Sequence, residues 1–228
     1  MSVHSTSSDF KGNAHRALGN PKLQQAMGFV RTGFIEKRAA AADRLPEFEA
    51  LRDSAREIKT HTLAHLDLYI ERYEQKVAEA GGVVHFARDA AEARNLILDL
   101  CKSVDAKIVT KGKSMVAEEI GLNAHLEAHG LTPVETDLGE YIIQLRNEMP
   151  SHIIAPAVHV TQDQVEADFR RVHTHLDPAR NLEEPSSLLA EARGVLRDRF
   201  LTADVGITGA NFLVAETGTS IIVTNEGN

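Results

Sequence analysis

A regular alternation of short apolar runs with longer amphipathic runs, between residues 82 and 160, constrains the fold of this chain most strongly. Short apolar runs bounded by turn residues predict strands, here at residues 83–86, 107–110, 133–135 and 152–155. Longer runs with helical periodicity predict helices at residues 90–101, 115–129 and 138–145. Such alternation is typical of an α/β fold with a mostly parallel sheet flanked by helices.

The segments on either side of this region have different patterns. Residues 1–20 are polar and are expected to form a flexible, dispensable leader. Residues 21–80 carry few helix breakers and predict an N-terminal helical region, which ends at Gly81 and Gly82. Residues 81–228 then form one α/β domain, with helices at 161–203 and a hairpin of strands at 212–216 and 219–224. Residues 225–228 read as a turn, which suggests a domain truncated at its C-terminus.

Composition excludes several classes of protein. The net charge of −8 argues against binding to a nucleic-acid backbone. No apolar run approaches the ~20 residues of a membrane span, and the start lacks the apolar core of a secretory signal. The single cysteine, Cys101, excludes a disulfide framework and a cysteine-ligated cluster within this chain, and it suits a reducing cytoplasm.

The first candidate site is the lysine loop that follows the strand predicted at residues 107–110. Lys111 and Lys113 supply positive charge, and Ser114 can cap the helix that begins there. Free N–H groups at a helix start favour an anion. The loop lacks the first glycine of a phosphate-binding P-loop. An ordinary strand-to-helix turn with solvated lysines explains the pattern equally well.

The helix predicted after this loop places two polar side chains within its apolar face. Glu119 and Asn123 lie one turn apart on that face, whereas Glu118 lies off it and is expected to be solvated. A buried carboxylate is costly unless it is paired. Glu119 is therefore expected to meet Lys111 or Lys113, or to line a polar cleft. A structural network explains it more readily than catalysis.

Two further segments combine turn residues with carboxylates. Glu135, Thr136 and Asp137 lie where a strand ends and a helix begins, a favoured ligand position in open α/β sheets. Asp137 and Glu140 also resemble a helix-capping box. Gly206 and Gly209 precede Glu216, Thr217 and Gly218, and this glycine-rich segment, residues 206–211 and 215–219, is expected to line a ligand cleft. Glu216 is a candidate nucleophile or base, although a carboxylate that accepts turn N–H bonds is the simpler interpretation.

We expect a ligand cleft in which the lysine loop and the residues 135–137 face the hairpin turn. The full set of predicted ligand-binding residues is Lys111, Lys113, Ser114, Glu119, Asn123, Glu135, Thr136, Asp137, Glu216, Thr217 and Gly218. No metal site is expected, because the histidine pairs at 61/65 and 125/129 lack the glutamate that zinc proteases place after the first histidine. A small carboxylate or phosphate-bearing ligand would suit this mixture of groups.

Several of these segments, taken in order, resemble the LUD-domain family, in its lactate-utilisation protein B branch. The specific stretches are ETDLGEYIIQL (135–145) and AETGTSIIVTNEGN (215–228), and PSHIIAPAVH (150–159) belongs to the same series. The resemblance covers roughly residues 20–228. It implies a fold like the phosphosugar-isomerase and CoA-transferase superfamily.

The resemblance also implies a function. It implies an iron–sulfur electron-transfer component of a bacterial complex that oxidises L-lactate to pyruvate beside partner subunits. In the family the 4Fe-4S clusters lie on cysteine motifs after the LUD domain, so this chain corresponds to an N-terminal portion without clusters. Two alternatives stay open. One is an acyl- or CoA-transferase-like enzyme that uses Glu216. The other is a pure assembly module whose helices at 21–80 bind partners.

Overall fold

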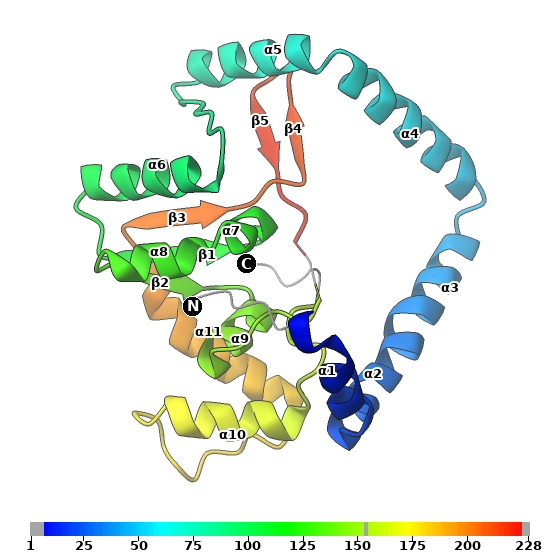
Figure 1. Cartoon of the computed structure of the whole chain (residues 1–228), viewed down its shortest axis with the longest axis vertical. Coiled ribbons are helices and arrows are strands. Elements are labelled where there is room, and N and C mark those ends of the chain that lie inside the picture. Colours follow the sequence, from blue (N-terminus) through cyan, green and yellow to red (C-terminus); the bar gives the residue numbers. More distant parts are fainter. Residues whose placement is uncertain (1–6, 153–154, 225–228) are drawn as a thin grey trace. The chain divides into compact units, whose positions relative to one another are not determined.

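The structure is a computed structural model that describes residues 7–152 and 155–224. Figure 1 shows the course of the chain. The chain forms two compact units. The first comprises residues 1–27, 87–209 and 224–228, and the second comprises residues 28–86 and 210–223.

The first unit contains a three-stranded parallel sheet in the order β2-β1-β3. Its strands are β1 (Ile108–Gly112), β2 (Thr132–Glu135) and β3 (Val205–Thr208). In the register of the central strand, Lys111 lies beside Glu135 of β2 and Gly112 lies beside Thr208 of β3. Because the strands are parallel, their carboxyl ends emerge at one edge of the sheet. The predicted α/β class with a parallel sheet flanked by helices is confirmed.

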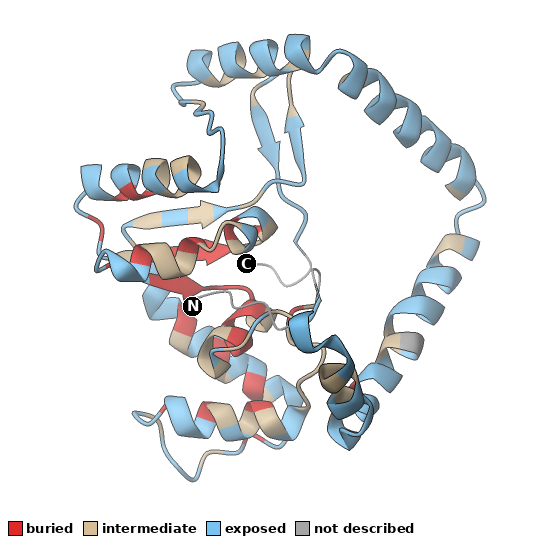
Figure 2. Ribbon diagram, viewed as in Figure 1, coloured by how far each residue is buried: buried red, intermediate tan, exposed pale blue. Residues whose placement is uncertain are grey.

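Helices pack on both faces of the sheet. Val109 joins a hydrophobic cluster with residues of three helices, α6 (Ala90–Ser103), α7 (Met115–Glu119) and α8 (Leu122–Ala128). The neighbouring Ile108 packs against a second cluster, built on α9 (Leu138–Arg146), α10 (Gln162–Val172) and α11 (Pro185–Thr202). Successive side chains of a strand point to opposite faces, so the two clusters lie on opposite sides of the sheet. In Figure 2 the buried residues gather on β1, β2 and these helices.

Local capping explains where several of these helices begin. Asp89 accepts a hydrogen bond from the backbone N–H of Glu92 at the start of α6. At α10, Thr161 and Gln164 form a reciprocal capping box. α11 begins with Pro185, whose fixed backbone angle suits a first helical turn. These caps satisfy N–H groups that have no partner within the helix.

Four segments differ from their predictions in the residues that the structure describes. Residues 83–86 form no strand, because no neighbouring strand pairs with them. The helix predicted at 115–129 is interrupted between α7 and α8, where Gly121 adopts a left-handed conformation with φ of 65°. Residues 205–208, which the sequence suggested as part of a glycine-rich ligand segment, form strand β3. In the strand predicted at 152–155, His152 and Ala155 lie outside any strand, and residues 153–154 lie outside the described residues.

The stretch predicted as a flexible leader contains regular structure in its described part. A 3-10 turn, η1 (Ser7–Asp9), leads into α1 (Phe10–Leu18), and Asp9 caps this helix at the backbone N–H of Gly12. The helix α2 (Pro21–Val30) follows. None of the side chains of η1 and α1 is buried. Whether this stretch is dispensable stays a prediction.

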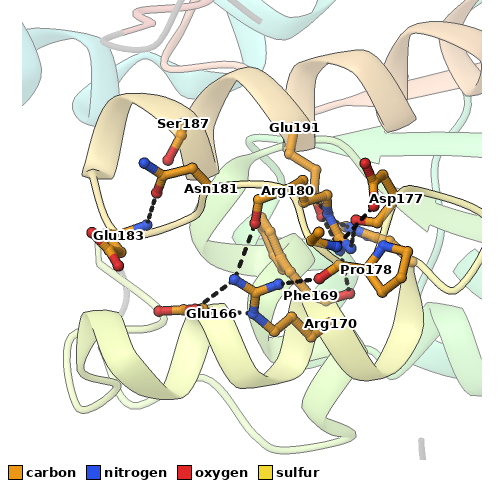
Figure 3. A network of polar contacts seen from close by, with 12 residues as sticks. Glu166, Phe169, Arg170, Asp177, Pro178, Arg180, Asn181, Glu183, Ser187 and Glu191 are labelled. Atoms are coloured by element: carbon orange, nitrogen blue, oxygen red, sulfur yellow. Dashed lines mark hydrogen bonds and ion pairs between the residues drawn. The ribbon is translucent and has the colours of Figure 1, made fainter.

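A polar network fastens the loop between α10 and α11, and Figure 3 shows it at close range. Arg170 donates to the carbonyl groups of Pro178 and Arg180 at 2.9 and 3.1 Å. Arg180 in turn binds the carboxylate of Glu191 on α11. The same carboxylate contacts Nδ1 of the buried His173 at 2.7 Å, and the other ring nitrogen contacts the hydroxyl of Tyr141 at 2.8 Å. The loop is thereby tied to three helices of the second cluster.

The second unit consists of exposed helices and a β-hairpin. The hairpin is antiparallel, as predicted, and pairs β4 (Phe212–Val214) with β5 (Thr219–Ile221). It lies against the helix α5 (Leu66–Glu79), where the hydroxyl of Tyr73 contacts that of Ser220 at 2.9 Å. The helical elements are η2 (Arg31–Glu36), α3 (Lys37–Asp43), α4 (Phe48–Ala64) and α5 (Leu66–Glu79). Residues 21–80 are thus largely helical, as predicted. Within the described residues, no helix is long and apolar enough to cross a membrane.

Candidate functional site

The carboxyl edge of the parallel sheet collects most of the residues that the sequence singled out. Lys111 lies in β1 itself, Lys113 and Ser114 follow β1, residues 136 and 137 follow β2, and Gly209 follows β3. These loops press closely together. A Cβ atom at Gly112 would lie 2.6 Å from the hydroxyl of Thr136, and one at Gly209 would lie 2.1 Å from the carbonyl oxygen of Lys113. Only glycine allows this approach.

Lys111 lies at the centre of a buried polar cluster. Its side chain is 1% exposed, and Nζ lies 2.6 Å from Oε1 of Glu118 and 2.8 Å from Oε1 of Glu135. Burial alone would lower the pKa of Lys111. The two carboxylates outweigh burial and raise the pKa above its ordinary value. Lys111 is therefore a charged group inside the fold, and it is not available as a solvated cation.

Glu135 and Asn123 complete the pairing around Lys111. The amide of Asn123 donates to Oε1 of Glu135 at 2.5 Å. Burial raises the pKa of Glu135, against the opposing effect of Lys111. The raised pKa values of Lys111 and Glu135 have one cause. The cluster contains more carboxyl groups than ammonium groups, which favours the protonated form of both residues. The predicted proximity of Lys111, Asn123 and Glu135 is thus present in the structure.

Glu140 adds a third carboxyl group to this cluster. It is 5% exposed. Burial, followed by repulsion from Glu135, raises its pKa to about 8. Near neutral pH the group is therefore mostly protonated. The predicted capping box is only half formed, because Asp137 caps α9 through the N–H of Gly139 at 3.1 Å while Glu140 points into the cluster.

Three oxygen atoms of this cluster have no hydrogen-bond partner among the described residues. They are Oε2 of Glu135, Oε2 of Glu140 and Oδ1 of Asn123. A hollow of ≈ 20 Å³ adjoins these residues and also Glu118 and Gln144. That is roughly the room needed by one water molecule. A water in the hollow could donate to the oxygens of Glu135 and Asn123 and accept from the protonated Glu140.

The roles expected for Glu118 and Glu119 are reversed. Glu118 binds Lys111 and is largely sheltered, whereas Glu119 is exposed. The expectation that Glu119 is buried and pairs with a lysine is wrong. The reason is the interruption at Gly121, because the face of a continuous helix at 115–129 does not apply to the five-residue helix α7.

The second lysine of the loop is also paired. Lys113 contacts the carboxylate of Asp137, and its backbone is left-handed with φ of 60°. Ser114 caps α7 by accepting from the N–H of Ala117 at 3.3 Å, as predicted. The predicted attraction for an anion is weaker than expected, because each lysine already faces a carboxylate and α7 is short. Lys113 remains partly accessible, with 16% of its side chain exposed.

An open hollow of ≈ 220 Å³ lies on the carboxyl edge beside Lys113. Three threonine hydroxyls contribute to its wall, those of Thr110, Thr136 and Thr208. Thr110 donates to the carbonyl group of Val205 at 3.4 Å, and Thr136 donates to that of Lys111 at 3.1 Å. The remaining lining residues are Gly112, Phe200, Gly206 and Ile207.

Glu216, Thr217 and Gly218 form the turn between β4 and β5. Gly218 has a φ of 70°, and its N–H donates to the carbonyl of Val214 at 2.9 Å. Glu216 is exposed. These residues belong to the second unit, whose position relative to the first is not determined. The shared cleft with the lysine loop therefore stays a prediction.

The chain's single thiol is a core residue. Cys101 is 1% exposed and packs in the cluster of α6, α7 and α8. Burial raises the pKa of this thiol, which disfavours the thiolate that binds metals. Among the described residues, no group of three or more histidine, cysteine or acidic side chains is arranged to hold a metal ion.

The geometry defines a helix-flanked parallel α/β domain with a buried lysine–carboxylate cluster at the carboxyl edge of its sheet. Residues 70–228 match the LUD domain family, and the chain belongs to that family. This agrees with the resemblance seen in the sequence. No solved structure gives a match. The placement in the phosphosugar-isomerase and CoA-transferase superfamily accordingly stays a prediction.

Curated relatives resemble this chain along nearly its whole length. It is 43% identical to lactate utilization protein B of Bacillus licheniformis, over 96% of this chain and 45% of the relative. It is 41% identical to the protein of the same name from Bacillus subtilis, with the same coverage. It is 39% identical to the uncharacterized electron transport protein YkgF of Escherichia coli, over 100% of this chain and 47% of the relative. The chain thus spans less than half the length of these relatives.

Proposed function

We propose that this chain is the LUD-domain portion of a bacterial lactate-utilisation protein. The whole protein would serve as an iron–sulfur electron-transfer subunit of a cytoplasmic complex that oxidises L-lactate to pyruvate, beside other lactate-utilisation subunits. The observation that carries this proposal is the 41–43% identity to lactate utilization protein B over 96% of the chain. The likeness to an electron transport protein supports the redox role.

The iron–sulfur clusters of this proposal do not fit the present residues. A 4Fe-4S cluster usually takes four thiolates, and the chain has one cysteine, which is buried. Cluster ligands would have to come from the remainder of the full-length protein. The LUD portion would then act before or beside electron transfer, by holding a ligand or a partner, and it would not carry electrons itself.

The hollow on the carboxyl edge is the part of this domain that suits the ligand. A hydroxy acid such as L-lactate has a carboxylate, which can bind the ammonium group of Lys113 in competition with Asp137. It also has a hydroxyl group, which can donate to the side-chain oxygen of Thr110. The existing pair between Lys113 and Asp137 would make this binding weak.

The assembly hypothesis has one observation in its favour. The helices α4 and α5 bury no side chain, yet they expose large apolar residues, among them Leu51, Ile58, Leu63 and Leu68. Such residues would be covered in a complex. The acyl-transfer hypothesis for Glu216 gains no support, because that carboxylate is exposed in a hairpin turn.

The proposal can be tested by complementation. A bacterium whose own lactate-utilisation protein is deleted is given the full-length form of the present protein, and its growth on L-lactate is measured. We expect the wild type to restore growth, and Lys113→Met to slow it. Lys107→Met, an exposed lysine just before β1, serves as the control and should grow like the wild type. Failure of the wild type to restore growth on lactate, with normal growth on glucose, would refute the proposal.

A further inference from the structure

The segment after α9 contains a chain of three hydrogen-bonded side chains that the proposed function does not use. The hydroxyl of Ser151 lies 2.6 Å from Nδ1 of His159. The other ring nitrogen, Nε2, lies 2.9 Å from Oε2 of Glu148. Arg146 binds the second oxygen of this carboxylate at 2.9 Å. A hydroxyl, an imidazole and a carboxylate in this order form the arrangement that activates serine nucleophiles.

The charge of Glu148 determines which ring nitrogen of His159 donates and which accepts. Arg146, followed by His159, lowers the pKa of Glu148, so this group is a carboxylate at neutral pH. A carboxylate on Nε2 holds the ring proton at that nitrogen. Nδ1 is then left to accept the proton of Ser151. The arrangement works with the two ring nitrogens in the opposite sense from trypsin-like proteases, and the base is equally well placed.

Ser151 opens into a hollow of ≈ 300 Å³. Met115, Met149 and Pro150 give this hollow apolar walls, and His152 completes its lining. Glu119 and Glu118 make one side acidic, although Glu118 is paired with Lys111. The hydroxyl-bearing residue is exposed, whereas His159 is sheltered with 19% of its side chain exposed. A substrate can therefore reach the nucleophile while the base stays shielded from bulk water.

We propose that Ser151 is a nucleophile toward neutral or cationic carboxylic esters with an apolar acyl group, with His159 as its general base and Glu148 as a positioning residue. Ser151 Oγ attacks the ester carbonyl carbon as its proton passes to Nδ1 of His159. The bond to the alkoxide leaving group breaks, and the leaving group takes that proton. Water then attacks the acyl-serine with the same base, which releases the acid and restores the hydroxyl.

The chemistry of the hollow separates this substrate class from the hydroxy acid of the proposed function. Acidic side chains on the rim disfavour anions, and methionine and proline walls favour an alkyl chain. The competing interpretation is that the three hydrogen bonds only fasten the loop between α9 and α10, beside the backbone bond from Ser151 to Pro156 at 3.0 Å. In that case the hydroxyl of Ser151 would be no more nucleophilic than that of an ordinary serine.

The test uses the full chain and a fluorophosphonate, a probe that reacts covalently with activated serine hydroxyls. Peptide mass spectrometry then locates the label. We expect Ser151 to be labelled stoichiometrically, and at least about 100-fold faster than the exposed Ser103, because a general base typically contributes 10²–10⁴-fold. His159→Gln should slow labelling at Ser151 about 100-fold, and Glu148→Gln by a smaller factor.

Two controls separate reactivity from folding. Ser151→Ala should abolish the label, while Ser103→Ala should leave it unchanged, and circular dichroism should show that both variants are folded. Hydrolysis of p-nitrophenyl butyrate should follow the same order among the variants. Labelling of Ser151 no faster than of Ser103, or a rate unchanged in a folded His159→Gln variant, would overturn the proposal and leave the three residues as a loop fastening.

Discussion

Lys111 and Glu135 are neighbours in the register of β1 and β2, and their side chains also form an ion pair of 2.8 Å. Both side chains are almost completely buried, at 1% and 3% exposure. Two charges removed from water are stable only when further hydrogen bonds complete their shells. Glu118 adds a bond to Lys111 and Asn123 adds one to Oε1 of Glu135, while Oε2 of Glu135 faces the small hollow. The sheet and the polar cluster therefore depend on each other.

Removal of the buried ammonium group should be strongly destabilising. Lys111→Met leaves Glu135 and Glu118 without their cation, and we expect the free energy of unfolding to fall by about 3–5 kcal/mol. Lys107→Met, at an exposed position next to β1, should change it by less than about 0.5 kcal/mol. Urea denaturation measures both variants. Equal stability of the two would mean that the buried pair is not formed.

The raised pKa of Glu140 should make stability depend on pH. The folded state holds its proton up to about pH 8, whereas the ordinary pKa is 4.5. Between these values the folded state binds more protons than the unfolded state, so stability falls as the pH rises. The Glu140→Gln side chain stays neutral at every pH. The free energy of unfolding of this variant should therefore rise relative to that of the wild type by about 1 kcal/mol per pH unit between pH 5 and pH 8. Denaturation curves at several pH values test this, and a constant difference would contradict it.

Glycine substitutions should have opposite signs at two positions. Gly209→Ala places a Cβ 2.1 Å from the backbone oxygen of Lys113, so we expect a loss of about 1–3 kcal/mol from overpacking. Gly194 lies inside α11 with no atom within 4 Å of an added Cβ. Gly194→Ala should therefore stabilise by about 0.5–1 kcal/mol through helix propensity. Thermal unfolding measures both, and a harmless Gly209→Ala would show that the loops are not pressed together.

Deletion of residues 1–20 should leave the thermal midpoint nearly unchanged. The described part of this stretch forms α1, but none of its side chains is buried, and neither hydrophobic cluster of the first unit includes it. A drop of more than about 4 °C would mean that the stretch docks on the rest of the chain, since about 1 kcal/mol produces such a shift. Differential scanning calorimetry of the shortened and full chains measures the two thermal midpoints.

The order of the main elements could be predicted from the sequence because local signals marked them. Apolar runs located β1 and β2, and residues with capping potential, such as Ser114 and Asp137, marked helix starts. Strand β3 was missed because its glycine and threonine residues resemble a ligand-binding turn. Only pairing with β1, which lies about a hundred residues earlier in the chain, makes this segment a strand.

The site was predictable in location and not in its charges. Strand ends in a parallel sheet share an edge, so Lys111, Glu135 and Asp137 could be expected together. Each lysine faces a carboxylate because of how the side chains pack. The hydrophobic periodicity of the sequence carries no information about that packing. The exchange between Glu118 and Glu119 has a single cause, the break at Gly121, which turns the first helix relative to a continuous one. Glu140 was missed because a capping pattern explained it already.

Binding of L-lactate to the carboxyl edge tests the central claim most directly. A titration of the ¹⁵N-labelled chain with millimolar L-lactate, followed by amide chemical shifts, should perturb Gly112, Lys113, Thr136 and Thr208 around the hollow of ≈ 220 Å³. Lys113→Met should weaken this binding by about tenfold or more, equivalent to ~1.4 kcal/mol. Lys107→Met should bind like the wild type. Absence of shifts at this edge at saturating lactate, or shifts that persist unchanged in Lys113→Met, would contradict the account.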